Sequence, residues 1–482
     1  MRWLACLLEL LCAPAMAMAQ DRYDPANYKP PQFAEADCHL RVPFLPEARN
    51  WERIDVYVPK APADAKLPCV IFFYGGGWGG KVTGGVTAEM KELLARGYVV
   101  AMPDYLLGAS EPVPQTIWDG AAAVRFLRAN SAKYRIDPER IGAWGFSAGG
   151  WLAQYLAPSD SSTLWAIEER SGGKRGQMMF FPMLDPNPAN GDFSARLTAF
   201  VTDWGAGRLD EKRMHKWNPS WLSPDDPPVF TCHNSAEGEV PLGPRMLRAV
   251  GGVAEVVQLD VKNTHSPNPR SPSRDKPGWT WRQHVHDFLD RQVKNPTVAT
   301  APEILPHGGP IGGPTEVTLR SVHPAGQIRY TTDGSVPTAT SARYDRPVTV
   351  KPGTTLRAMV IRDGLQPSRV ATAVFTATKL ARPRITTPQR AFAAKVGRPF
   401  EVQFAAEGAE GVQWNIAGKL GVTRTRTNPP REEPWLTMDR KTGRLCGTPP
   451  AAGVCVFVVS AAVGDGDAVL CDGVSVVVTI TE

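Results

Sequence analysis

The sequence predicts an α/β domain, in which a mostly parallel sheet is flanked by helices, followed by two small β-sandwich domains. Runs typical of strands alternate with runs typical of helices from Arg53 to Arg291, and this alternation favours a parallel sheet. Beyond Lys294 the helical patterns stop, and turn residues separate short alternating runs at a spacing of about 8 to 12 residues, as in β-sandwiches. A break at residues 379–383 (KLARP) divides this second part in two.

The alternating part can be divided into individual elements. The expected strands are residues 70–74, 98–102, 141–146, 177–183, 229–232 and 256–259, and the expected helices are residues 87–96, 117–129, 149–156 and 281–293. The run 117–129 (IWDGAAAVRFLRA) is predicted to be amphipathic, with one face on the sheet.

Length and composition agree with several globular domains. A chain of 482 residues exceeds what one ordinary core supports. With 43% hydrophobic and 21% charged residues it is globular, and its 44 Gly and 45 Pro favour turns and short strands. The formal net charge of +6 is small for this length and no dense Lys/Arg run occurs, so we expect no nucleic-acid partner.

Residues 1–19 have the pattern of a signal peptide. Arg2 supplies a positive charge, residues 4–13 are mostly apolar, and residues 17–19 (AMA) form a cleavage site. Cleavage after Ala19 makes the expected mature protein secreted or periplasmic. No other stretch reaches the roughly 18 apolar residues that a membrane span needs, so no transmembrane segment is expected.

The cysteines do not suggest a metal site. Cys69 and Cys232 stand in apolar runs and are predicted to be buried thiols. Cys446, Cys455 and Cys471 crowd into the C-terminal segment, where an oxidising compartment permits a disulfide whose pairing the sequence does not determine. The chain has neither a CxxC nor an HExxH motif, so we expect no metal ion.

A serine with the sequence context of a nucleophile follows one of the expected strands. Residues 145–150 (GFSAGG) place Ser147 between an extended run and a helical run. This is the G-x-S-x-G context in which a serine sits on a sharp strand-to-helix turn, with the helix N-terminus near a developing negative charge. The alternative is a flexible turn without a catalytic role.

A second glycine cluster lies about seventy residues upstream. Residues 75–78 (GGGW) follow the expected strand at 70–74. A glycine-rich loop lets backbone N–H groups approach an oxyanion without obstruction by Cβ atoms. Taken alone the cluster is an ordinary strand-end turn. Together with Ser147 it predicts an oxyanion hole formed by Gly76, Gly77 and Ala148.

From about Arg53 to Val293 the chain resembles the α/β-hydrolase superfamily. It is most similar to the esterase/lipase branch related to hormone-sensitive lipase and to bacterial carbohydrate esterases. The residues that carry the resemblance are 74–78 (YGGGW), 103–105 (PDY), 118–121 (WDGA), 134–141 (YRIDPERI) and the following GFSAGG. The resemblance implies an α/β-hydrolase catalytic domain at residues 20–293 and no cofactor. The family usually has His where Tyr74 stands here.

The resemblance also implies a catalytic triad in the order serine, acid, histidine. The family's acid motif matches residues 233–241 (HNSAEGEVP), where Glu237 takes the place of the aspartate and Glu239 is the alternative. His265 follows the last expected strand and is the expected general base. His284 and His286 lie inside the final helix and are predicted to have packing or surface roles.

Two further resemblances concern the β-rich part, after a linker at residues 294–302. Residues 303–378 are similar to the C-terminal module of chitobiases and hexosaminidases, on the motif at 328–338 (IRYTTDGSVPT). Residues 382–482 resemble an immunoglobulin-like module of bacterial surface and secreted proteins, on the motifs at 435–443 and 447–453. Both resemblances imply spacers or weak binding modules without catalytic residues.

Together these features predict an exported serine carboxylesterase with the triad Ser147, Glu237 and His265. The presence of the β-modules in the same chain favours a carbohydrate esterase that removes acetyl or feruloyl-type groups from a polysaccharide. A prolyl-oligopeptidase-like serine peptidase is one alternative, and a catalytically silent glycan-binding or surface protein on the same scaffold is another. The acyl group, the sugar and the oligomeric state are left open.

Overall fold

The structure is a computed structural model. It describes residues 28–46, 52–62, 64–77, 80–81, 86–107, 114–161, 163–171, 174–186, 188–203, 222–234, 242–260, 270–419, 435–465 and 468–482. The expected signal peptide at residues 1–19 therefore lies outside the described residues.

The α/β domain is built on an eight-stranded, mostly parallel sheet, as the sequence predicts. Its order is β1-β2-β4-β3-β5-β8-β9-β10, with β1 and β2 antiparallel to their neighbours and the other strands parallel. The strands are β1 (Ala36–Pro43), β2 (Arg53–Pro59), β3 (Leu67–Phe73), β4 (Val99–Pro103), β5 (Ile136–Phe146), β8 (Phe200–Asp203), β9 (Val229–Asn234) and β10 (Ala254–Leu259).

The prediction places one strand in this sheet that the structure places elsewhere. Residues 177–183 do form a strand, but it belongs to a separate hairpin of β6 (Leu164–Ser171) and β7 (Lys174–Pro182). The position between β5 and β9 is taken by the four-residue strand β8. Because β8 is so short, it gives no clear periodic signal in the sequence.

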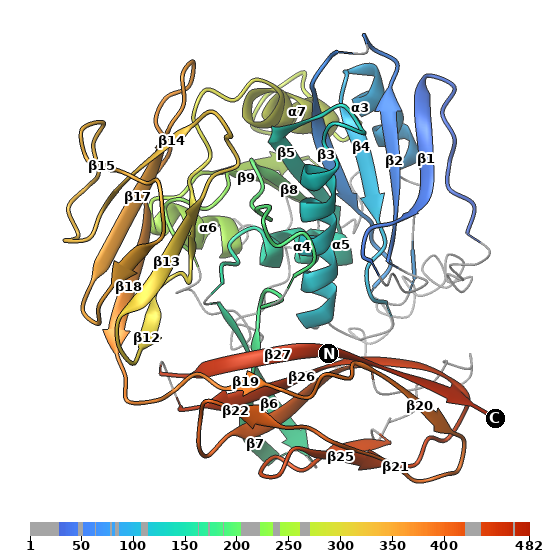
Figure 1. The fold of residues 1–482 in the computed structure, drawn as a ribbon. Helices are drawn as coiled ribbons and strands as arrows, with labels where there is room; N and C mark the ends of the chain where they lie inside the picture. The colour runs from blue at the N-terminus through green and yellow to red at the C-terminus, as the bar shows by residue number, and fades with distance from the viewer. Residues whose placement is uncertain are drawn as a thin grey trace, which may run out of the picture.

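Four of the five described α-helices form two pairs on the sheet, with α4 and α5 side by side (Figure 1), and α6 packs on β10. The helices are α3 (Thr87–Ala95), α4 (Pro114–Ala129), α5 (Ala148–Leu156), α6 (Leu242–Ala249) and α7 (Trp281–Leu289), and α7 continues into the π-helix η3 (Asp290–Lys294). Helices α3 and α7 form the other pair and are joined by ion pairs of Arg282.

Helix α4 is not amphipathic, which corrects the sequence prediction. Arg125 and Arg128 are only 6% and 4% exposed, and almost every other residue of the helix is buried as well. Arg128 satisfies its guanidinium with backbone oxygens, including those of Pro138 and Arg196. Helix α4 also contacts the C-terminal part of the chain.

Residues 303–377 form the strands of a β-rich unit, the middle module, which docks on the α/β domain through polar contacts. Its strands are β11 (Glu303–Leu305), β12 (Gly309–Ile311), β13 (Thr315–Arg320), β14 (Gln327–Thr331), β15 (Ala342–Arg343), β16 (Val348–Val350), β17 (Thr355–Ile361) and β18 (Ala371–Ala377). His323 Nδ1 lies 2.9 Å from Glu139 Oε2, and His307 Nδ1 lies 2.7 Å from Asp160 Oδ2. In the segment predicted to be a linker, Ala299 and Ala301 are buried.

Residues 384–481 form the strands of a second β-rich unit, the C-terminal module. Its strands are β19 (Arg384–Ile385), β20 (Ala391–Lys395), β21 (Phe400–Gln403), β22 (Ala406–Glu407), β23 (Gln413–Lys419), β24 (Leu436–Met438), β25 (Arg444–Gly447), β26 (Gly453–Val463) and β27 (Leu470–Thr481). A four-stranded sheet, β20-β27-β26-β23, and a three-stranded sheet, β21-β25-β24, enclose its core.

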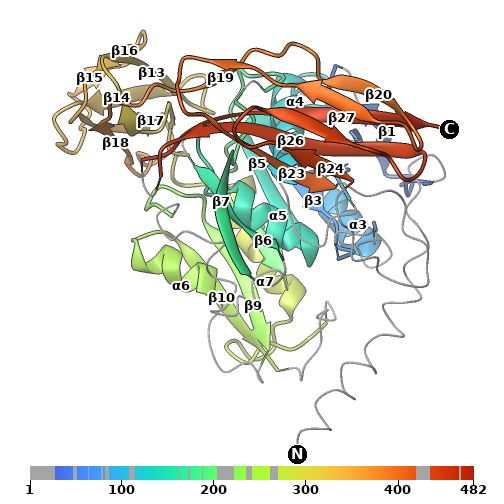
Figure 2. The same cartoon turned by 90° about the horizontal axis from the view of Figure 1, so that it is seen from below.

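The C-terminal module packs directly on the α/β domain, and hairpin β6–β7 lies against its four-stranded sheet (Figures 1 and 2). Strand β7 contacts β23, β26 and β27, and Ser460 Oγ of β26 donates to the Phe180 oxygen at 2.6 Å. Ala417 and Val458 of the module belong to the same hydrophobic core as the large sheet. The two parts are therefore one continuous packed body rather than an enzyme and a tethered spacer.

The described residues also bear on the cysteines and on membrane insertion. Cys69 and Cys232 are buried, as predicted, and no disulfide joins any two of the six described cysteines, which include Cys446, Cys455 and Cys471. No helix in the described parts of the chain has both the length and the apolar character needed to cross a membrane.

Candidate active site

Ser147 occupies the sharp turn between β5 and α5. Its φ of 52° and ψ of −116° lie in a region that non-glycine residues rarely adopt. Such a conformation costs on the order of 1 to 3 kcal/mol and persists only where surrounding contacts enforce it. This geometry presents the half-buried side chain of Ser147 at the carboxyl edge of the sheet, as expected for a nucleophile elbow.

The glycines on both sides of Ser147 are required by close backbone packing. A Cβ atom on Gly145 would lie 2.1 Å from the Gly149 oxygen, and one on Gly149 would lie 2.0 Å from the Phe73 oxygen. Neither distance is compatible with a side chain, and both obstacles are backbone atoms that cannot rotate away. These contacts press the turn against β3 and thereby enforce the conformation of Ser147.

The glycine loop after β3 lies directly against this turn. A Cβ atom on Gly75 would lie 3.1 Å from the Ser147 Cβ atom. Gly76 and Gly77 follow with φ angles of 138° and 59°, which favour glycine. Ala148 is the first residue of α5, so its N–H has no acceptor within the helix. The residues predicted for the oxyanion hole thus stand on two segments next to the nucleophile.

Tyr74, which stands where the resembled family has His, is held by Tyr105. The centres of the two stacked rings lie 4.5 Å apart, and the Tyr105 hydroxyl donates to the backbone oxygen of Tyr74 at 2.5 Å. The Tyr105 N–H lies 3.4 Å from the Tyr74 hydroxyl and donates to it. A tyrosine pair therefore fixes the entry to the glycine loop.

The predicted acids Glu237 and Glu239 and the predicted base His265 lie outside the described residues. The strands before them are nevertheless described. Strand β9 ends at Asn234 and β10 ends at Leu259. Strands β5, β8, β9 and β10 are neighbours in this order and all run in the same direction. Since parallel strands end at one edge of a sheet, the segments after β9 and β10 start at the same edge as Ser147.

Asp203, at the end of β8, is a residue of this edge that the sequence analysis missed. Its backbone oxygen accepts the Ser147 N–H at 2.8 Å. Its fully buried carboxylate accepts the indole N–H of Trp144 at 2.5 Å and that of Trp281 at 3.2 Å. Burial raises the pKa of Asp203 to about 7, and the bonds from the two indoles oppose this rise. Asp203 ties the nucleophile turn to α7.

The raised pKa predicts a pH dependence of stability that Asp203→Asn removes. The folded protein keeps a proton on Asp203 from about pH 4 to about pH 7, whereas the unfolded chain has released it. The folded state therefore loses stability as the pH rises through this window, by at most about 1.4 kcal/mol per unit. We expect the urea midpoint of the wild type to fall between about pH 5 and pH 7.5 by more than that of the Asn variant. Equal falls in both proteins would contradict the assignment.

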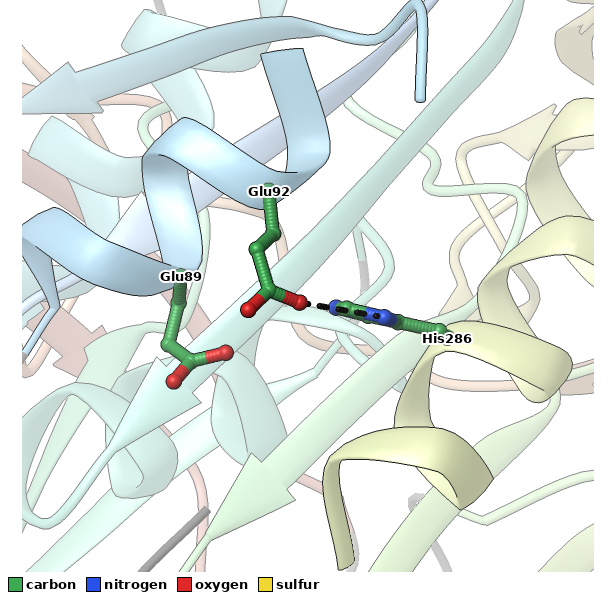
Figure 3. Close-up of side chains that lie close together, drawn as sticks. All are labelled: Glu89, Glu92 and His286. Carbon is green, nitrogen blue, oxygen red and sulfur yellow. Dashed lines mark ion pairs between the residues drawn. The ribbon is translucent and has the colours of Figure 1, made fainter. Parts of the chain in front are cut away.

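Behind this edge, α3 and α7 are joined by a group of charged side chains (Figure 3). Glu89, Glu92 and His286 are the one set of potential metal ligands within reach of one another that the described residues contain. Arg282, however, donates to both glutamates, at 2.6 Å for Glu89. Burial, together with Arg96 and Arg282, lowers the pKa of His286 to about 4, so its ring is neutral at pH 7. We therefore interpret the group as a set of ion pairs that joins α3 to α7.

Comparisons with known families agree with this geometry. Residues 54–178 match the BD-FAE family model, and residues 306–372 match the model of the chitobiase/beta-hexosaminidase C-terminal domain. The resemblances to α/β-hydrolase esterases and to chitobiase C-terminal modules are thereby confirmed.

Individual relatives cover only part of this chain. Carboxylesterase NlhH of Mycobacterium tuberculosis is 36% identical over 133 residues, which are 24% of this chain and 41% of the relative. Endo-1,4-beta-xylanase B of Butyrivibrio fibrisolvens is 26% identical over 237 residues, which are 44% of this chain and 36% of the relative. The chain thus spans less than half the length of these curated relatives.

A solved structure of a truncated carbohydrate esterase from gut microbiota is 18% identical, with a TM-score of 0.42. It covers 55% of this chain, and all of that esterase chain is covered. From the sheet order, the serine turn and the two family matches, we conclude that the chain contains an α/β-hydrolase domain similar to esterases, followed by a β-rich region with a module similar to the chitobiase C-terminal domain.

Proposed function

We propose that the chain is an exported serine carboxylesterase with the triad Ser147, Glu237 and His265. The observation that carries the proposal is the strained conformation of Ser147, with the glycine loop packed against it. A serine held at this turn by backbone contacts is arranged for nucleophilic attack, since a serine without such a role gains nothing from the strain.

The reaction follows from the parts at this edge. The Ser147 hydroxyl attacks the ester carbonyl carbon while His265 takes its proton, and Glu237 accepts the other imidazole N–H. The tetrahedral intermediate collapses, and its alcohol leaves with the proton from His265. Water, deprotonated by the same base, then attacks the acyl-enzyme and releases the acid.

Backbone donors stabilise the negative charge that develops on the carbonyl oxygen. Gly76, Gly77 and Ala148 supply these N–H groups, and the N-terminus of α5 adds its dipole. Neither glycine carries a side chain, so the loop approaches the oxygen closely. The assigned residues thus supply the nucleophile, the general base, the acid that orients the base and the oxyanion donors that ester hydrolysis requires.

For the substrate we infer a carbohydrate ester with an acetyl or feruloyl-type acyl group. The support is associational: a region that matches the chitobiase C-terminal domain follows the catalytic domain, and one relative is named as a xylanase. A polysaccharide ester also fits an exported enzyme. The site itself does not distinguish among acyl groups.

The test is the release of acetate and ferulate from acetylated and feruloylated polysaccharides, with aryl acetates and an aminoacyl arylamide alongside. We expect ester hydrolysis and no arylamide hydrolysis, with the Ser147→Ala protein as the blank. Arylamide hydrolysis would indicate a peptidase. A folded wild-type protein that hydrolyses no ester would indicate a catalytically silent binding protein.

The choice between the two candidate acids can be tested by amide substitution. We expect Glu237→Gln to lower kcat by more than about tenfold, because a misaligned imidazole loses up to about 10⁴-fold in the best-studied triad. Glu239→Gln, in the same loop, is the matched control and is expected to change kcat little. If Glu239→Gln is the impaired variant, the motif is shifted by two residues, and if neither is impaired, the acid lies elsewhere.

A further inference from the structure

The loop that carries the oxyanion donors folds back on itself. Gly76 adopts a φ of 138°, and a Cβ atom on it would lie 2.1 Å from the Gly80 oxygen. The backbone that leaves the glycine cluster is therefore pressed against the backbone that enters it, and the next described residue is Lys81. We call the described residues 74–77 and 80–81 the oxyanion loop.

Lys81 is a buried lysine at the end of this loop. Its side chain is 0% exposed, although its backbone reaches the surface. Its ammonium group donates to Asp104 at 2.6 Å and lies 3.9 Å from Asp55. Burial lowers the pKa of Lys81, and the two aspartates oppose this. A fully buried ammonium group persists only where such partners offset the loss of its hydration.

Aromatic rings and a second cation also lie close to Lys81. Its Nζ atom lies 3.9 Å from the ring centre of Tyr28 and 5.0 Å from that of Tyr74. These rings face the cation, which favours its burial. Arg41 donates to the other carboxylate oxygen of Asp104, and its N–H donates to Asp55 at 2.8 Å. Among the described residues, Lys81 and Arg41 thus share the carboxylates of Asp104 and Asp55.

Two consecutive residues after β4 hold the two ends of the oxyanion loop. Tyr105 binds Tyr74 at the entry to the loop, and Asp104 binds Lys81 at its exit. Asp104 directly follows β4 and is fixed to the start of β2, since its N–H donates to the Arg53 oxygen at 2.8 Å. The glycines between the two ends have no side chains of their own with which to hold their conformation.

We propose that Lys81, through its ion pair with Asp104, is a positioning residue that holds the N–H groups of Gly76 and Gly77 at the oxyanion. The proposal rests on the esterase function proposed above. Lys81 contacts no substrate in this assignment. It acts through the loop: the ion pair fixes the position of the loop's last residue and thereby restrains the glycine turn before it.

The test compares Lys81→Met with the double variant Lys81→Met/Asp104→Asn. The single variant leaves an excess of buried negative charge and is at risk of not folding. The double variant removes one cation and one anion, so the net charge is unchanged, and it keeps the approximate size of both side chains. Lys91→Met is the matched control, because the Lys91 side chain is 68% exposed on α3 and its ammonium group lies 3.9 Å from Glu35, away from Asp104.

For the double variant we expect kcat on an aryl acetate to fall by about 10²- to 10³-fold, the usual effect of losing one oxyanion donor. KM is expected to change by less than about threefold, because these donors act mainly on the transition state. We also expect the ratio of the ester rate to the rate of the matching thionoester to fall, since sulfur accepts hydrogen bonds weakly and gains less from the donors. A merely structural role would lower stability without changing this ratio.

Hydrogen exchange of the peptide that covers residues 74–81 provides a readout that needs no activity. We expect this peptide to exchange faster in the double variant, with the strands of the large sheet unchanged and Lys91→Met like the wild type. Unchanged exchange overturns the proposal, and so does a folded double variant with wild-type kcat and rate ratio. A wild type without esterase activity contradicts the proposed function instead, and the exchange data still decide whether Lys81 holds the loop.

Discussion

Ser147→Ala is expected to lower kcat for ester hydrolysis by about 10⁴-fold or more, while the protein remains folded. The effect follows from the loss of the only atom that forms the acyl-enzyme, and single triad substitutions in serine hydrolases have effects of this size. Alanine keeps the Cβ atom, so the turn experiences the same contacts with Gly75. The measurement is kcat on an aryl acetate, with a denaturation curve for each protein.

Ser159→Ala is the matched control for this experiment. Ser159 lies beyond the other end of α5, where its hydroxyl donates to the Tyr155 oxygen. The same atom is removed at a distance from the sheet edge, so we expect kcat to stay near the wild-type value. Activity of Ser147→Ala within about tenfold of the wild type would reject the nucleophile and the mechanism with it.

Much of the sheet could be predicted because its strands carry local signals. The runs at 70–74, 98–102 and 141–146 are apolar, and glycines bound two of them. Such fully buried parallel strands need no partner to be recognised. Strand β8 has four residues and lies in a segment of mixed composition, so the sequence did not indicate it.

Long-range packing explains the error at α4. The pattern of residues 117–129 predicts one apolar and one solvated face, yet Arg125 and Arg128 are buried. The partners of Arg128 come from later segments of the chain: its guanidinium donates to the Arg196 oxygen, 68 residues along the chain. No periodicity within a helix reports a partner of this kind.

The distinction between local signals and long-range contacts also applies to the candidate active site. Ser147 and the glycines stand in short motifs whose residue types follow from local geometry, so the sequence reveals them. Asp203 and Lys81 carry no motif, because their roles come from partners on other elements: two indoles for Asp203, and Asp104 for Lys81. Buried charged side chains of this kind are recognised only once the fold brings their partners together.

His265→Ala is expected to lower kcat by about 10³- to 10⁴-fold, because His265 is the predicted acceptor of the Ser147 proton. The segment that carries it follows β10, which ends at the carboxyl edge shared with β5. His284→Ala is the matched control. The His284 ring packs 4.9 Å from that of Trp279, and burial lowers its pKa, so we expect its loss to affect stability more than kcat. The wild-type rate should also fall as the pH drops through the usual titration range of a histidine, because a protonated imidazole cannot accept the Ser147 proton. If His284→Ala loses activity and His265→Ala keeps it, the base comes from α7, and the loop after β10 has no catalytic role.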